Sequence, residues 1–209
     1  MNRRGDRGSA ASDESLLADF LSGDHGSFEI LVERHSEDLF RFVSRFIRNS
    51  AAAEDVVQET FVQVFQSAAG FDASRRFRPW LFTIAANKAR DFLRSRLRKR
   101  ELPLSQGAGG DASDAVSYLD FLSDDEAAPD SALEAEETRR RVGEVVARMP
   151  DNLREVLMLG YFQRFAYKEI ADILSIPLGT VKSRLHAAVS HFAQQYRKLE
   201  ESGSRGRGD

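Results

Sequence analysis

Apolar residues at helical spacing run through most of the chain, and this pattern leaves few folds open. They recur every three or four positions from Leu16 to Leu93 and again from Leu153 to Phe192. The spacing predicts helices over residues 13–22, 26–48, 51–69, 80–99, 135–149, 151–159, 167–174 and 178–196. No stretch alternates apolar and polar residues as a half-buried strand would. The sequence therefore predicts an all-α fold.

The composition changes between Glu101 and Glu137, where eleven acidic residues and no basic residue occur. Glycines and prolines also interrupt the helical spacing there, as is typical of a flexible linker. We therefore expect two small helical domains joined by a flexible acidic linker. The expected divisions are a disordered N-terminus at 1–12, a first domain at 13–100, the linker at 101–134, a second domain at 135–197 and a disordered tail at 198–209.

Charge is strongly segregated, although the formal net charge of the chain is only -3. Ten basic residues and one acidic residue lie between Arg75 and Arg100, and eleven basic and five acidic residues lie between Thr138 and Leu199. A basic block of this density is typical of a surface that binds phosphates. A solvated helix face is the alternative for the first block taken alone. The two blocks together favour a nucleic-acid partner.

Several classes of function are disfavoured by residues that are scarce or badly spaced. The chain has no cysteine, which excludes disulfides and thiolate chemistry, and its four histidines lack the spacing of a helical metal site. Phosphate-binding loops and nucleophile elbows are also missing. We therefore expect no catalytic residue, no metal and no cofactor, and so no enzyme. No apolar run could serve as a signal peptide or a membrane span, which predicts a cytoplasmic protein without membrane insertion.

The segment from Tyr167 to Gln195 has the pattern of a helix-turn-helix, two short helices joined by a tight turn around Pro177. The second helix is predicted to bury Val181, Leu185, Val189 and Phe192. Its other face would present Thr180, Lys182, Ser183, Arg184 and His186. Donors near the start of such a helix suit insertion into the major groove. An ordinary helical hairpin with a solvated polar face is the alternative.

Three segments, in this order, resemble motifs of the extracytoplasmic-function sigma factors, the smallest sigma subunits of bacterial RNA polymerase. They are Ala53–Phe61, Phe77–Asn87, and Leu153–Leu157 together with the helix-turn-helix. The resemblance covers roughly residues 15–100 and 135–197. It implies that the chain binds core RNA polymerase and promoter DNA, melts the promoter without hydrolysis and directs initiation. It also implies an anti-sigma factor as a partner, since members are commonly held inactive by one.

The resemblance further assigns residues to three surfaces. Core polymerase would be bound by Asp55, Gln58, Glu59 and Phe61. The minus-ten element would be bound and melted by Phe71, Arg75, Arg76, Phe77, Arg78, Trp80, Asn87, Lys88, Arg90 and Arg94, although Trp80 could equally be a core residue. The minus-thirty-five element would be read by Thr180, Lys182, Ser183, Arg184 and His186. Ala187 and Val189 stand where the family usually has basic residues, which predicts weaker phosphate anchoring there.

Two other readings of the sequence remain open at this point. One is a stand-alone helix-turn-helix regulator whose first half senses a ligand or dimerises. A sensor half would need neither an arginine-rich loop nor a basic helix, so the block from Arg75 to Arg100 argues against it. The other is an adaptor that binds polymerase without binding promoters, which the altered recognition helix leaves open.

Overall fold

The computed structural model describes residues 11–101 and 132–205 of the 209-residue chain, and within those ranges all regular elements are helical. The N-terminal domain contains α2 (Asp13–Leu21), α3 (His25–Ile47), α4 (Ser50–Ser67), the 3-10 turn η1 (Ala68–Gly70) and α5 (Phe77–Glu101). The C-terminal domain contains α6 (Ala132–Arg148), α7 (Asp151–Leu157), the π-helical turn η3 (Met158–Phe162), α8 (Tyr167–Leu174) and α9 (Leu178–Arg205). The predicted all-α fold with two helical domains is confirmed.

Short polar side chains set where the first helices begin. Ser12, Asp24 and Asn49 precede α2, α3 and α4, and each accepts a hydrogen bond of 2.8–3.1 Å from a backbone amide two or three residues further on. Such caps satisfy amides that have no partner inside the helix. Gly23, with φ of 104°, makes the turn between α2 and α3. The observed starts of these helices agree with the predicted ones to within one residue.

Three predicted boundaries are wrong by three residues or more. Helix α6 begins at Ala132 and not at residue 135, so residues 132–134 are helical and do not belong to a flexible linker. Helix α5 begins at Phe77 and not at residue 80, because Glu14 from α2 accepts a hydrogen bond from the Phe77 amide (2.8 Å), and Pro79 is tolerated in a first helical turn. Helix α9 continues to Arg205, so a disordered tail does not begin at 198; residues 197–201 are good helix formers without Gly or Pro. The remaining predicted disordered and linker residues, 1–10, 102–131 and 206–209, lie outside the described ranges.

The N-terminal domain is built around α3, which packs against α2, α4 and α5. Leu39, Phe42 and Phe46 of α3 and Phe82 of α5 are almost completely buried, and the rings of Phe42 and Phe82 lie 5.4 Å apart. In the C-terminal domain the buried Arg154 joins α6 to α7, since its guanidinium donates to the carbonyls of residues 147 and 149 (3.2 and 3.3 Å). Each domain is thus stabilised by contacts within itself, the N-terminal domain by buried apolar side chains and the C-terminal domain by the hydrogen bonds of Arg154.

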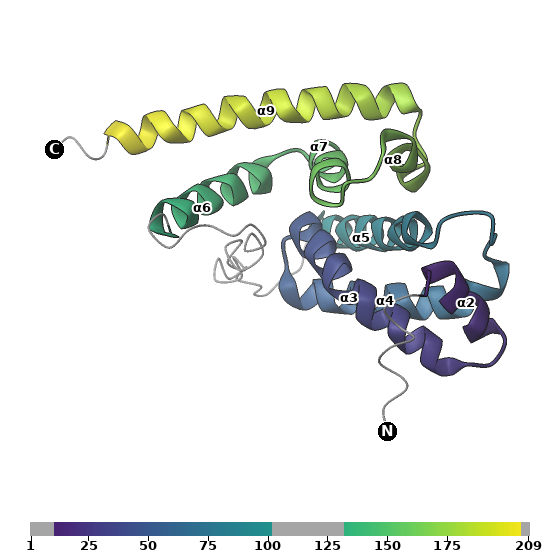
Figure 1. The fold of residues 1–209 in the computed structure, drawn as a ribbon. Coiled ribbons are helices and arrows are strands. Elements are labelled where there is room, and N and C mark those ends of the chain that lie inside the picture. The colour runs from purple at the N-terminus through teal and green to yellow at the C-terminus, as the bar shows by residue number, and fades with distance from the viewer. Residues whose placement is uncertain (1–10, 102–131, 206–209) are drawn as a thin grey trace.

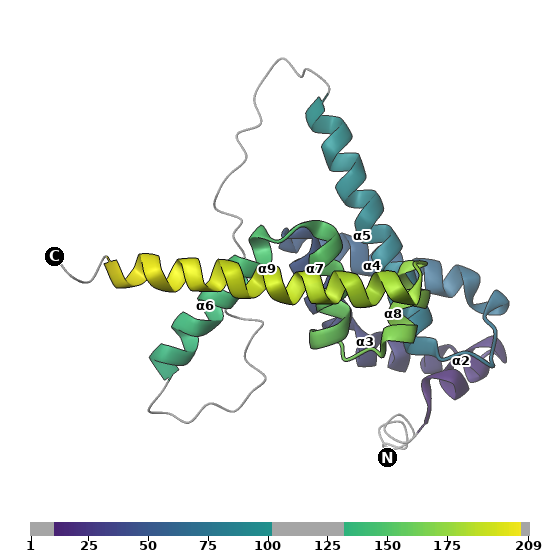
Figure 2. The ribbon, with the colours of Figure 1, turned by 90° about the horizontal axis from the view of Figure 1, so that it is seen from above.

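The C-terminal domain lies directly on the N-terminal domain. In Figure 1, α7 and α8 form a layer between α9 above and α5 below, and Figure 2 shows α9 crossing over both of them. Helix α5 contacts α8, and α3 contacts α7 and η3. The rings of Phe82 in α5 and Phe165, just before α8, meet edge to face at 5.0 Å. The apolar core is therefore continuous from one domain to the other.

Candidate nucleic-acid interface

The outward face of α4 carries three of the four residues predicted to bind polymerase. Asp55, Gln58 and Glu59 are exposed. Phe61, the fourth, is only 8% exposed and packs in the domain core, so its side chain cannot contribute to a surface in this arrangement. Burial of Phe61 follows from the helical repeat, because Val57 and Val64 on the same side are buried too.

Two exposed apolar residues of α4 were not predicted from the sequence to belong to a binding surface. Val62 is 55% exposed and Phe65 is 51% exposed, and together with Asp55 and Gln58 they repeat at steps of three, four and three along the helix. That spacing makes a narrow stripe of the kind that packs against another long helix. The ring of Phe65 is held by Phe20 and Phe28, at 5.1 and 5.5 Å between ring centres. The 3-4-3 spacing was the signal that could have identified both residues.

The loop between η1 and α5 is closed at its base by a cluster of aromatic rings. Phe77 is fully buried between His35 (5.6 Å) and Trp80 (5.8 Å), and the half-buried Trp80 also packs on Phe71 at 4.7 Å. Phe77 therefore belongs to the core and is not available to stack on a base, whereas Phe71 and Trp80 keep part of their ring surface exposed. Trp80 is therefore neither a fully buried core residue nor a fully exposed one.

The tip of this loop is ordered by its own side chains. Asp72 accepts hydrogen bonds from the amide and the hydroxyl of Ser74, at 2.9 and 2.7 Å. These hydrogen bonds, with a smaller contribution from the charge of Arg75, lower the pKa of Asp72. Arg75 and Arg76 are exposed beside this turn. The loop therefore presents the Arg75 and Arg76 guanidinium groups on a backbone that the Asp72–Ser74 hydrogen bonds hold in one conformation.

Further along α5, the predicted DNA-binding residues are largely accessible. Asn87 and Arg94 are exposed, and Lys88 is half-buried. The Lys88 ammonium lies 3.6 Å from the Glu59 carboxylate of α4. This ion pair places the outward face of α4 and the basic face of α5 side by side.

Arg78 and Arg90 of α5 point toward the C-terminal domain instead of toward solvent. Arg78 donates to the backbone oxygen (3.0 Å) and the side-chain oxygen (2.7 Å) of Gln163, and its guanidinium lies 4.5 Å from the Phe165 ring centre. Arg90 donates to the carboxylate of Glu155 at 3.0 Å. Both arginines were predicted to bind the minus-ten region. In this arrangement the other domain occupies them.

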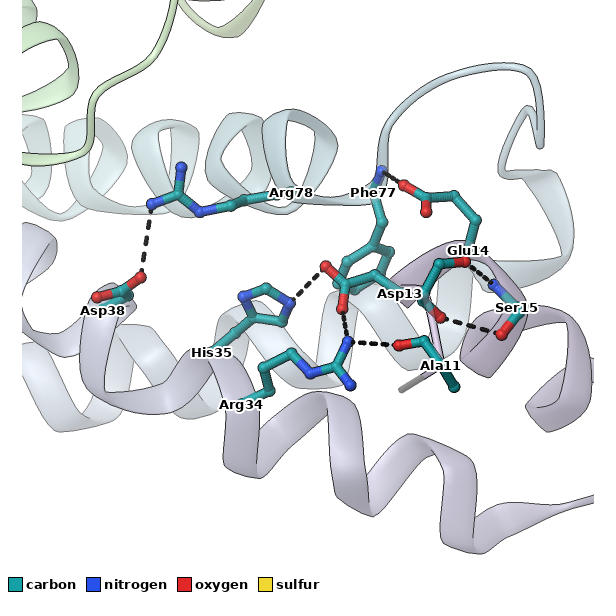
Figure 3. Close-up of polar contacts among 10 residues, drawn as sticks. Ala11, Asp13, Glu14, Ser15, Arg34, His35, Asp38, Phe77 and Arg78 are labelled. Atoms are coloured by element: carbon teal, nitrogen blue, oxygen red, sulfur yellow. Dashed lines mark hydrogen bonds and ion pairs between the residues drawn. The ribbon is translucent and has the colours of Figure 1, made fainter. Parts of the chain in front are cut away.

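The first turn of α2 fixes the start of α5, as Figure 3 shows. Asp13 pairs with Arg34 and with the buried His35, whose Nε2 lies 2.9 Å from the carboxylate. Burial raises the pKa of Asp13, but hydrogen bonds and charge from His35 and then from Arg34 outweigh it, so the pKa is lowered. The next residue, Glu14, accepts the hydrogen bond from the Phe77 amide. No sequence pattern predicts this contact, because 63 residues separate its partners.

Helices α8 and α9 form the predicted helix-turn-helix. The turn between them contains Ser175 in the left-handed region with φ of 53°, and Ile170, Ile173 and Val181 are buried at the crossing. Lys182, Ser183 and His186 are exposed, while Thr180 and Arg184 are half-buried. The exposed residues lie on the N-terminal half of α9, the part that a major groove accepts.

The prediction that Val189 is buried is wrong. Val189 is 59% exposed, and Ala188 is fully buried in its place. Positions 181, 185, 188 and 192 keep to one face of the helix by steps of four, three and four, whereas 189 is turned about 100° further round. Val189 therefore lies on the outward stripe that also carries Lys182 and His186.

No group of three or more histidine or acidic residues within the described ranges is arranged to hold a metal ion. Among the same residues, no helix combines the length and the apolar character needed to cross a membrane.

Comparison with protein-family models gives two matches in chain order. Residues 31–99 match sigma-70 region 2, and residues 139–192 match sigma-70 region 4. The ECF RNA polymerase sigma-E factor of Escherichia coli is 31% identical over 177 residues, which cover 85% of this chain and 90% of that protein. The ECF RNA polymerase sigma factor SigW of Bacillus subtilis is 29% identical, with 85% and 92% covered. Both comparisons span the two domains.

Solved structures agree with this result. CnrH, in complex with the cytosolic domain of CnrY, is 25% identical and superimposes with a TM-score of 0.61, covering 88% of this chain and 96% of that one. The fold and the two matched regions define a sigma subunit of bacterial RNA polymerase. Within that class, the chain belongs to the extracytoplasmic-function family of sigma-70 factors. It binds core RNA polymerase and directs promoter-specific initiation of transcription, as the sequence predicted.

The family assignment also decides between the alternatives left open by the sequence. A ligand-sensing or dimerising first half is contradicted, because residues 31–99 match the sigma-70 region 2 model. An adaptor without promoter recognition does not fit a chain that carries both sigma regions. Sigma factors are, as a family, not catalysts.

Proposed function

We propose that three surfaces of this sigma factor divide the work of initiation. The outward face of α4 binds core polymerase, the 71–76 loop with the exposed face of α5 captures the minus-ten strand, and the N-terminal half of α9 reads the minus-thirty-five element. Residues 13–100 thus bind polymerase and melt DNA, and residues 135–197 bind upstream DNA. The observation that carries this division is the Lys88–Glu59 pair, in which a cation of α5 lies 3.6 Å from a carboxylate on the outward face of α4.

The α4 surface suits a basic, partly apolar partner. Asp55 and Glu59 supply negative charge that steers association, and Val62 with Phe65 supplies the apolar centre that contributes most of the binding free energy at typical interfaces. We therefore place Asp55, Gln58, Glu59, Val62 and Phe65 in this surface and assign Phe61 to the core beneath it.

The α5 surface suits single-stranded DNA. An aromatic ring stabilises an unstacked base by about 1–3 kcal/mol, and arginine adds cation–π and phosphate contacts. Phe71, Trp80, Arg75 and Arg76 offer both kinds of group around the loop. Asn87, Lys88 and Arg94 continue the surface along the helix toward the upstream duplex. Melting then needs no hydrolysis, because the captured strand is bound better than the closed duplex.

On α9, Lys182, Ser183 and His186 reach the groove edge, with Thr180 and Arg184 closer to the domain body. Val189 contributes no charge to phosphate binding. We place the protein in the cytoplasm, where it meets core polymerase, and propose an anti-sigma factor as an additional partner.

Run-off transcription with purified core polymerase and a mapped cognate promoter tests the proposal. The chain should confer initiation at a discrete start site. Asn87→Ala with Arg75→Ala should reduce strand opening, measured by permanganate reactivity of unpaired thymines, more than it reduces formation of the closed complex. Lys182→Ala with Ser183→Ala should instead weaken closed-complex formation. Asp19→Asn, an exposed change on α2, serves as the control. Equal effects of both pairs on both steps would contradict the division.

A further inference from the structure

A cavity of about 350 Å³ lies between the two domains, where α5 runs beneath α7 and α8 (Figure 1). Helices α3 and α5 supply one side of it, and α7, the end of α8 and the first turns of α9 supply the other. This volume is near the lower end of the range for sites that hold small organic ligands. The side chains that line the cavity decide which ligand it suits.

The polar part of the lining contains more cations than anions. Three arginines line the cavity, together with two acidic residues that already have partners. Asp151 pairs with Arg154 of its own helix, and Glu155 accepts a hydrogen bond from Arg90 at 3.0 Å. Neither carboxylate is therefore paired with the third arginine of the lining, Arg184 of α9. The arginines of the lining are Arg90, Arg94 and Arg184.

Two of these guanidinium groups have donors without an acceptor in the described part of the chain. Nη2 of Arg90 is buried and makes no hydrogen bond there, and the half-buried Arg184 makes neither a hydrogen bond nor an ion pair with the described residues. Buried donors are nearly always satisfied in proteins. Burial raises the pKa of Glu155, and the charges of Arg90 and then Arg184 partly offset this, so both arginines lie close to that carboxyl. An anion in the cavity would supply the missing acceptors.

The rest of the cavity is an apolar wall, formed by Phe46, Leu93, Leu174 and Ile176. Phe46 and Leu174 are almost completely buried, whereas Leu93 and Ile176 are half-buried and keep part of their surface accessible. A wall of this kind beside cations suits a ligand that has an apolar ring at one end and a negative charge at the other. The sites of small ligands typically combine such an apolar lining with a few polar groups that fix the orientation of the ligand.

A second cavity, of about 270 Å³, also lies between the domains but lacks this combination. Its three arginines are matched by three acidic residues, and only two apolar side chains line it. The charged residues are Arg76, Arg78, Arg164, Asp13, Glu14 and Glu169, and the apolar ones are Pro79 and Phe165. Arginines alone therefore do not distinguish the larger cavity; the unpaired donors beside an apolar wall do.

We propose that the larger cavity is a binding site for a small aromatic anion, whose carboxylate or phosphate is held by Arg90 and Arg184 and whose ring packs on the apolar wall. Arginine recognises both kinds of oxyanion through paired hydrogen bonds. Arg94 adds positive charge, although it is exposed and also lies 3.4 Å from Asp91. The volume of the cavity limits the ligand to about the size of a mononucleotide. This inference goes beyond the proposed division of the polymerase and DNA surfaces and does not depend on it.

Calorimetric titration of the full chain with two probes tests the site. Adenosine 5′-monophosphate carries a phosphate and 1-naphthoate carries a carboxylate, so the pair distinguishes the two oxyanions. At a salt concentration of about 0.15 M, we expect at least one probe to bind with a Kd below about 1 mM. The neutral counterparts, adenosine and 1-naphthylmethanol, lack the charge, whereas inorganic phosphate and acetate lack the ring. Each of these should bind at least about ten-fold more weakly than the probe from which it derives.

Two variants remove the site in different ways. Arg184→Gln removes the cation that has no partner, and Asn152→Trp fills the cavity from an exposed position of its lining while every arginine stays in place. Both should weaken binding of the probe by at least about ten-fold. Arg96→Gln is the matched control, because it removes the same charge from an exposed position of α5 outside the lining, and it should leave the affinity unchanged.

Thermal unfolding of each chain shows whether it is folded and gives a second measure of binding. A bound probe should raise the Tm of the native chain and of Arg96→Gln, and should raise it less in the two site variants. If Asn152→Trp does not fold, Arg184→Gln still tests the site, because the Arg184 side chain makes no polar contact with the described residues that its loss would break.

Three results would overturn the proposal. They are the absence of binding by both probes up to about 1 mM, equal affinity in the site variants and the control, and binding of the charged or neutral fragments as tight as that of the whole probe. Binding of either probe with the expected losses in Arg184→Gln and Asn152→Trp supports it, and the probe that binds more tightly identifies the oxyanion.

Discussion

Asp13 stabilises the N-terminal domain through opposing influences on a single carboxylate. Burial raises its pKa, but the hydrogen bonds and charges of His35 and Arg34 lower the pKa by more than burial raises it. The folded pKa therefore lies below the ordinary value of 3.8. Its stabilisation is therefore complete above that value and is lost as pH falls through the lowered pKa. Asp13→Asn should reduce the free energy of unfolding by about 1–3 kcal/mol at pH 7. Urea denaturation at pH 7 and pH 3 checks this, and the difference from the native chain should shrink at pH 3.

Asp19→Asn, on the exposed side of the same helix, is the control and should change stability by less than about 0.5 kcal/mol. A loss at Asp13→Asn that stays the same at both pH values would mean that packing, and not the ionised carboxylate, is responsible.

Glu14 acts one residue further on, as the cap of a helix that begins 63 residues away. Glu14→Ala leaves the Phe77 amide without this acceptor and should loosen the first turn of α5, at a cost of about 0.5–2 kcal/mol. Glu14→Gln keeps an acceptor oxygen. We expect the alanine variant to open promoters less fully than the native chain, by permanganate footprinting of the holoenzyme, and the glutamine variant to open them nearly normally. Identical defects in both variants would show that the charge matters and not the hydrogen bond.

At the scale of single elements, α4 separates a buried face from a contact face. Phe65→Ala should weaken binding to core polymerase by about ten-fold, because it removes the exposed ring at the end of the 3-4-3 stripe. Fluorescence titration of labelled chain with core polymerase measures this. Gln66→Ala, also exposed on α4, should leave affinity unchanged. Since Phe65 also packs on Phe20 and Phe28, thermal unfolding must show that the variant is folded; equal affinity in a folded variant would remove Phe65 from the surface.

Helix α9 offers a test of an altered position. Val189 lies on the same outward stripe as Lys182 and His186, so Val189→Arg should add about one phosphate contact. Affinity for upstream duplex DNA should rise, and the slope of log affinity against log salt should steepen by about one. Val189→Ala is the control and should change neither quantity. An unchanged salt slope in the arginine variant would show that DNA does not reach this part of the helix.

The success and failure of the sequence predictions follow from what periodicity can determine. Helical spacing located the helices because each buries a stripe of apolar residues. It placed Val189 on the wrong side because neighbouring positions differ by only about 100°, and a buried alanine at 188 gives a weak apolar signal. The motif resemblance placed Phe61 and Phe77 in binding surfaces, and only packing shows that both are core. The Glu14 cap and the Arg78–Gln163 contact join distant segments, which no local pattern reports.

At the scale of the whole molecule, the structure shows where the segregated charges of the sequence lie and what they contact. The basic block that begins at Arg75 supplies the cations of α5, and two of them, Arg78 and Arg90, are held by the C-terminal domain. A surface that must bind DNA is thereby satisfied inside the protein when DNA is absent. If polymerase or promoter binds better to a chain whose domains are apart, that ligand competes with these internal contacts.

Linkage makes this competition measurable at the α4 surface, which neither Gln163 nor Glu155 touches. If core polymerase binds the open chain better than the closed one, then a variant that opens the chain must bind core more tightly, by up to the factor by which closure disfavours the open form. Gln163→Ala with Glu155→Gln removes the side-chain oxygen that Arg78 contacts and the charge that Arg90 contacts. If about a tenth of native molecules are open, this double variant should raise core affinity by up to about ten-fold. Adding Phe65→Ala to this double variant should weaken core affinity by about the same factor as Phe65→Ala weakens it in the native chain, because the two effects act at separate sites. Titration of the four chains with core polymerase completes this cycle. An unchanged core affinity in the Gln163→Ala, Glu155→Gln variant would mean that polymerase binds closed and open chains equally. Promoter DNA would then be the ligand that separates the domains.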